Sequence, residues 1–155
     1  MLKIVSVQLD ENELWQSGEN LEDEKFIREF SLNKAGTLVL ELGEPFEINE
    51  KFNEFFVLIK IDLLKIEGQS YSFKLSENIK HYLNEATLFF SCNMNYFPYG
   101  YFYGFTHPSF YHEGKLIMKM NSYDLNFTFI VSEEQVNIFK EHRLGINNIS
   151  NAVID

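Results

Sequence analysis

The chain has 155 residues and a formal net charge of −10, and 16% of its residues are aromatic, with 16 Phe and 8 Tyr. This length is typical of one domain with its own hydrophobic core, so we interpret residues 1–155 as a single domain. The negative charge argues against binding to nucleic acid or anionic lipid, because both depend on cationic groups that face phosphate.

Nothing in the sequence predicts secretion or membrane insertion. The start, MLKIVSVQLDENELW, alternates apolar and polar residues and then turns acidic, which differs from the continuous apolar region of a signal peptide. No uncharged apolar run approaches the roughly 18 residues that span a bilayer. The single cysteine, Cys92, has no partner for an internal disulfide, which suits a reducing compartment. We therefore expect a soluble, cytoplasmic protein.

The first half of the chain predicts strands through its period of two. Residues 2–9 place Val5 and Val7 on one face, and residues 37–42 do the same for Leu38 and Leu40. Residues 24–33, EKFIREFSLN, give a weaker strand prediction through Phe26, Phe30 and Leu32. Residues 55–66, FFVLIKIDLLKI, predict an antiparallel strand, because Lys60 and Asp62 interrupt its second face.

The second half predicts further strands and two helices. Residues 86–94 predict a strand, and residues 115–121 and 123–131 predict a hairpin. One helix is predicted from Ser76, and a second from Ser132, where Gln135 completes a capping box and Lys140 and Arg143 suit the carboxyl end.

The predicted fold class is α+β and predominantly antiparallel β. We expect a sandwich-like or strongly curved sheet of about seven or eight strands with two short helices, because parallel strands would need a helix between most of them. The tail, residues 146–155, is either loose or docked through Ile146 and Ile149.

The stretch YFPYGYFYGFTHPSFYHEG, residues 96–114, concentrates the aromatic residues. In an extended strand Tyr99, Tyr101 and Tyr103 share one face. Such a row is either part of the core, with ring pairs between strands, or an interaction surface, since tyrosine anchors protein interfaces and stacks on sugars. It also fits a homodimer interface.

Acidic residues are concentrated near the amino terminus. Residues 1–54 hold 13 acidic and 5 basic side chains, whereas residues 55–155 hold 10 and 8. Between residues 10 and 24 there is no Lys or Arg. The charge either serves solubility alone or steers a basic partner toward the protein. The carboxylates assigned to partner binding are Asp10, Glu11, Glu13, Glu22, Asp23 and Glu24.

Catalytic chemistry has little support. His107, His112 and Glu113 are weak candidates for metal ligands, because their spacing matches no zinc motif. Cys92 alternates in register with apolar residues, which favours packing over nucleophilic catalysis. We find no phosphate-binding loop, nucleophile elbow or calcium loop, so we expect no cofactor and no enzyme.

These features lead to one leading hypothesis and two alternatives. The leading one is a protein-binding domain that occludes a basic macromolecular partner, as an immunity protein or inhibitor neutralises a cationic toxin such as a nuclease. Its acidic residues would steer the partner, and Tyr99, Tyr101 and Tyr103 would anchor it. The alternatives are a carbohydrate-binding, lectin-like β-sandwich that uses the tyrosine row and a small metal-dependent enzyme built on His107, His112 and Glu113.

Overall fold

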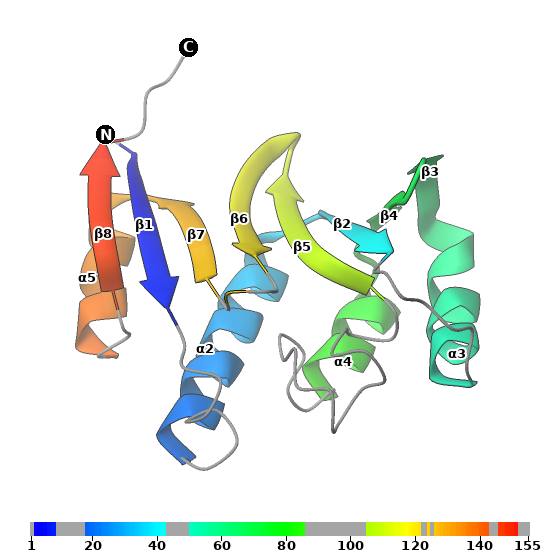
Figure 1. Cartoon of the computed structure of the whole chain (residues 1–155), viewed down its shortest axis with the longest axis horizontal. Helices are drawn as coiled ribbons and strands as arrows, with labels where there is room; N and C mark the ends of the chain where they lie inside the picture. The colour runs from blue at the N-terminus through cyan, green and yellow to red at the C-terminus, as the bar shows by residue number, and fades with distance from the viewer. Residues whose placement is uncertain are drawn as a thin grey trace.

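A computed structural model gives the fold of this chain (Figure 1). The structure describes residues 2–8, 18–42, 50–85, 105–121, 124, 126–142 and 146–151. These residues form one antiparallel sheet and four α-helices. The predicted class, α+β with predominantly antiparallel strands, is therefore confirmed, with one continuous sheet and two more helices than expected.

The eight described strands pair in the order β3-β4-β2-β5-β6-β7-β1-β8. They are β1 (Lys3–Gln8), β2 (Thr37–Leu42), β3 (Leu63–Glu67), β4 (Ser70–Lys74), β5 (Phe105–His112), β6 (Lys115–Asn121), β7 (Asn126–Val131) and β8 (Ile146–Asn151). The first strand lies between the last two, and the β3–β4 hairpin forms the opposite end of the sheet. The predicted hairpin of β6 and β7 is confirmed by their antiparallel pairing.

The helices lie on one side of this sheet (Figure 1). They are α2 (Gly18–Lys34), α3 (Glu50–Ile59), α4 (Glu77–Glu85) and α5 (Glu133–Glu141), and a short 3₁₀ helix, η1 (Lys60–Asp62), leads from α3 into β3. Helix α2 packs on β5 and β6 and beside α4, and α5 packs on β1. None of the described helices is long and apolar enough to cross a membrane.

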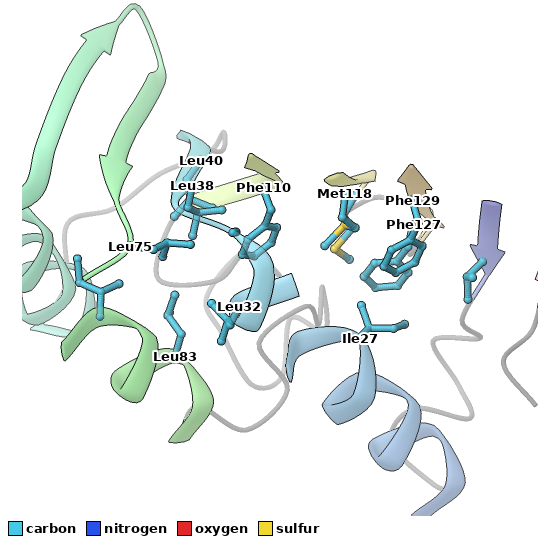
Figure 2. Packing of buried hydrophobic residues seen from close by; sticks show 14 of the residues in the cluster. Ile27, Leu32, Leu38, Leu40, Leu75, Leu83, Phe110, Met118, Phe127 and Phe129 are labelled. Atoms are coloured by element: carbon cyan, nitrogen blue, oxygen red, sulfur yellow. The ribbon is translucent and has the colours of Figure 1, made fainter. Parts of the chain in front are cut away.

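One row of side chains shows what the helices cover. Residues paired from strand to strand across the whole sheet are apolar at each of the eight positions: Leu63, Phe73, Leu38, Phe110, Met118, Phe129, Val5 and Ile149. Six of these, from Phe73 to Val5, are fully buried. Figure 2 shows side chains of this row pointing toward Ile27 and Leu32 of α2 and Leu83 of α4.

The neighbouring row lies on the other face of the sheet and has a different character. Its eight paired residues are Lys65, Ser72, Val39, Ser109, Lys119, Thr128, Ser6 and Asn148. All eight keep at least part of their surface exposed, and none is acidic. Since successive strand residues point to opposite faces, the sheet buries one face and presents a polar one.

Aromatic rings join the helices to the sheet at two places. Phe129 of β7 meets Phe30 of α2 and Phe139 of α5 edge to face, with ring centroids 5.7 and 4.9 Å apart. At the other end, Phe55 of α3 lies 6.1 Å from Phe73 of β4 and 5.9 Å from Phe105 of β5. Such contacts add to the burial of large apolar surfaces and fix where each helix sits.

One strand prediction was wrong, and a second was wrong in part. Residues 24–33 belong to α2, because Ile27, Ser31 and Leu32 are buried at helical spacing, whereas the strand prediction used Phe26, Phe30 and Leu32. The buried Arg28, 7% exposed, obscured this periodicity in the sequence. The Ser31 hydroxyl donates to the Ile27 carbonyl at 2.8 Å, inside the helix.

The second prediction, a strand at residues 55–66, was wrong for residues 55–62 and correct for residues 63–66, which pair antiparallel with β4. Residues 55–66 contain the end of α3, all of η1 and the start of β3. Phe55 and Ile59, four residues apart, are buried, while Val57 and Ile61 are exposed. A short and nearly continuous apolar run does not distinguish a helix from a strand by its periodicity.

Other predictions are confirmed by local geometry. The strand predictions at residues 2–9 and 37–42 correspond to β1 and β2, and both predicted helices form. At α5 the Ser132 hydroxyl accepts from the Gln135 amide at 3.3 Å, and the Gln135 side chain accepts from the Ser132 amide at 2.9 Å. Residues 146–151 of the tail form β8, which pairs with β1. The strand predicted at residues 86–94, with Cys92, lies outside the described residues.

Substitutions at adjacent positions on β6 test the one-sided burial. Met118→Ala removes a fully buried side chain and leaves a cavity, so we expect it to lower the free energy of unfolding by about 2–5 kcal/mol. Lys119→Ala on the opposite face should change it by less than about 0.5 kcal/mol. Urea denaturation measures both. Equal losses at the two positions would contradict burial of one face only.

Candidate interaction surface

Charge is distributed unequally between the two layers of the fold. The four described helices carry twelve acidic and six basic side chains, whereas the eight described strands carry two acidic and five basic ones. The helical layer is therefore net negative and the sheet is net positive. Such a polarity gives the molecule two surfaces that attract partners of opposite charge.

Helix α2 carries the acidic cluster that the sequence analysis selected. Glu22 is exposed and Asp23 is half-buried in the second turn of the helix. Lys25 is exposed, and its Nζ lies 3.9 Å from Oε1 of Glu29, which is one helical turn further along α2. Arg28 is buried, so Lys25 is the exposed cationic side chain of this part of α2.

The neighbouring helices continue the acidic character. Glu77 and Glu85 of α4 are exposed, and α4 packs beside α2. On α3, Glu54 is exposed and accepts a hydrogen bond from the Tyr82 hydroxyl at 3.2 Å. The carboxylates of α2 are thus accompanied by others on the same layer, which extends the negative surface beyond the cluster found in the sequence.

The structure describes only part of the predicted binding set. Glu22, Asp23 and Glu24 fall together on α2. The other predicted residues, Asp10, Glu11, Glu13, Tyr99, Tyr101 and Tyr103, lie outside the described residues. The adjoining Phe105, the first residue of β5, is fully buried and packs against Phe55 and Tyr71.

The three weak metal candidates are not gathered into one site. His112 Nε2 lies 3.8 Å from Glu113 Oε1 at an exposed turn. His107 lies five residues earlier on the same strand, at an irregularity where β5 has an additional residue opposite β2. Its φ of 51° is in the left-handed region. Within the described part of the chain, no three His, Cys, Asp or Glu side chains are placed to hold a metal ion.

A cleft that sequence analysis did not find lies at the other end of the molecule. It has a volume of about 340 Å³ and is lined by Lys3, Glu133, Val136, Asn137, Lys140 and Ile149, from β1, α5 and β8. Lys3 Nζ lies 3.5 Å from Glu133 Oε1 and donates to Asn151 Oδ1 at 2.5 Å. The lining therefore combines two ammonium groups, one carboxylate and an amide, and Lys3 already contacts Glu133 and Asn151. Its residues are distant in sequence, so no local pattern marks it.

Comparison of the chain with protein-family models, curated proteins and solved structures gave no match.

The turn that joins β5 and β6 holds a non-glycine residue in an unfavourable conformation. Glu113 has a φ of 49° and is followed by Gly114 at 78°, as a two-residue hairpin turn of type I′ requires. Asparagine tolerates this region better than glutamate because its short side chain bonds to the local backbone. We expect Glu113→Asn to raise the free energy of unfolding by about 1 kcal/mol.

Glu113→Gln is the matched control, since it removes the same charge without the preference for the left-handed region. It should leave the stability nearly unchanged, because the exposed pair with His112 contributes little. Thermal denaturation of the three proteins measures the difference. Equal stabilities of the Asn and Gln variants would contradict the turn geometry.

Proposed function

We propose that this chain is a non-enzymatic protein-binding domain that occludes a basic macromolecular partner. It would act as an immunity protein or inhibitor that neutralises a cationic toxin, for example a nuclease, in the cytoplasm. The observation that supports the proposal is the charge difference between the layers, with twelve acidic and six basic side chains on the described helices.

Long-range attraction would bring the partner to the helical side of the protein. Complementary charge raises association rates and orients the partner before contact. Glu22 and Asp23 of α2 belong to this surface. In the sequence Glu24 follows them, and Asp10, Glu11 and Glu13 precede the helix. The exposed carboxylates of α4 extend it.

Short-range contacts would then hold the partner in place. Tyr99, Tyr101 and Tyr103 keep their predicted role as anchors, because buried tyrosines contribute much of the binding energy in protein interfaces. A nuclease that binds nucleic acid presents a cationic surface to phosphate, and an acidic domain competes for that surface. Occlusion of this kind needs no catalytic group and no cofactor in the inhibitor.

The alternatives receive no comparable support from the described residues. The tyrosine row on which carbohydrate binding depends lies outside them. The metal-dependent enzyme depends on His107, His112 and Glu113, and these three do not form a group that could hold a metal.

Removal of charge from α2 tests the proposal. We would prepare one double variant on α2, Glu22→Gln with Asp23→Asn. The control is a second double variant, Glu133→Gln with Glu134→Gln, which removes the same charge from the first turn of α5. Each protein would be used for capture from host lysate at low salt, and the association rate of the captured basic protein would then be measured. We expect the α2 variant to lower that rate severalfold, roughly up to tenfold, and to weaken its salt dependence.

Neutral amides are chosen because they remove the charge and keep the side-chain size nearly the same. Circular dichroism verifies that both variants fold. The expected result is a specific loss with the α2 variant and a smaller effect with the α5 variant. Capture of no basic protein, or equal rates for all three proteins, would contradict the proposal.

A further inference from the structure

Exposed apolar side chains gather at the β3 end of the sheet. Val57, Ile61, Leu64 and Ile66 are 69%, 91%, 63% and 49% exposed, and they come from ten consecutive residues in α3, η1 and β3. The described residues contain only three other large hydrophobic side chains that are exposed. Isolated exposed apolar residues are ordinary, whereas a concentration of them on an edge strand indicates an interaction surface.

Strand β3 also offers backbone groups for pairing. It pairs with β4 on one side, and no described strand pairs with its other side. Glu67 and Ser70 flank the two-residue turn of the β3–β4 hairpin, and Ile66 is paired with Tyr71. Residues next to such a turn form a hydrogen-bonded pair, and the following pair does not. The N–H and C=O of Ile66 therefore point toward the free edge.

The sequence of this edge is complementary to itself. An antiparallel pair centred on Ile66 would place Ile66 opposite Ile66 of the second copy, and Lys65 opposite Glu67 of that copy, twice. A register centred on Lys65 would place two like charges together. Opposite charges at directly paired positions stabilise a sheet, and like charges destabilise it. The charges therefore favour the register centred on Ile66, which is also the register in which the outward N–H and C=O of Ile66 can pair.

We propose that two copies of this chain associate through β3, in an antiparallel pair centred on Ile66. The twofold axis runs perpendicular to the sheet, so the two eight-stranded sheets become one continuous sheet. Within one copy Lys65 Nζ lies 3.0 Å from Glu67 Oε2. In the dimer these two side chains and the same two of the second copy form a cluster of four charges, in which each lysine lies opposite a glutamate. Val57 and Ile61, which precede β3 in the sequence, are exposed on each copy.

Features of β3 limit this pairing to a single partner. A register shift between Leu63 and Lys65 leaves only residues 65–67 regularly paired with β4. Irregularities and charged residues on edge strands oppose indiscriminate aggregation. A short regular stretch with a self-complementary charge pattern instead favours a closed pair. The twofold arrangement places both acidic helical layers on the same side of the joined sheet. The pairing involves β3 alone, so it does not depend on the proposed function.

Charge exchange at two positions tests this register. Lys65→Glu puts glutamate opposite Glu67 of the second copy, and Glu67→Lys puts lysine opposite Lys65, in both cases twice. We expect each variant to raise the dimer dissociation constant about tenfold or more, measured by analytical ultracentrifugation over a range of protein concentrations. An equimolar mixture of the two variants restores opposite charges at all four positions, so it should form a heterodimer of near wild-type affinity.

Matched controls separate the register from net charge. Lys74→Glu on β4 and Glu41→Lys on β2 make the same changes at exposed positions away from the free edge, and they should leave the dimer intact. Both side chains changed in the test are more than half exposed, and circular dichroism verifies folding. A wild-type protein that stays monomeric at all concentrations would overturn the proposal. A dimer that tolerates either single exchange, or two variants that fail to associate when mixed, would also overturn it.

Discussion

The burial of one face of an eight-stranded antiparallel sheet determines the rest of this structure. One row of paired residues is apolar on every strand, and the adjacent row is polar on seven of the eight. The apolar face must be covered, and the four described helices cover it from one side. Phe129 shows how tightly this is arranged, since its ring meets Phe30 of α2 and Phe139 of α5. Much of the aromatic content thus serves the contact between the layers.

The polarity of charge follows from this arrangement. A helix that packs on an apolar face turns its charged side chains to solvent, so the acidic residues of α2, α3, α4 and α5 gather on one side of the molecule. The sheet keeps its few charged residues mainly on the opposite face, where Lys65 and Lys119 share one row. The protein consequently has a negative layer suited to a basic partner. It also has a sheet edge at β3 whose composition suits a second copy of itself.

The sequence predicted the parts of the fold that depend on local patterns. Alternation identified β1, β2 and β7, and the capping box at Ser132 and Gln135 identified the start of α5. Prediction from the sequence failed where the hydrophobic pattern was ambiguous. Arg28 is buried in α2, and the apolar run after Phe55 passes from helix to strand within a few residues. Of the candidate site, the acidic cluster on α2 was visible in the sequence, whereas the charge difference between layers required knowledge of which elements share a face.

The most direct test of this account is carboxyl footprinting of the protein with and without its captured basic partner. A carbodiimide labels exposed carboxylates, and mass spectrometry locates the labels. We predict that the partner protects Glu22, Asp23 and Glu29 of α2, while Glu41 and Glu67 of the sheet are labelled as before. Protection of Glu41 and Glu67 with unchanged labelling of α2 would show that the partner binds the sheet, and it would contradict the assignment of function to the helical layer.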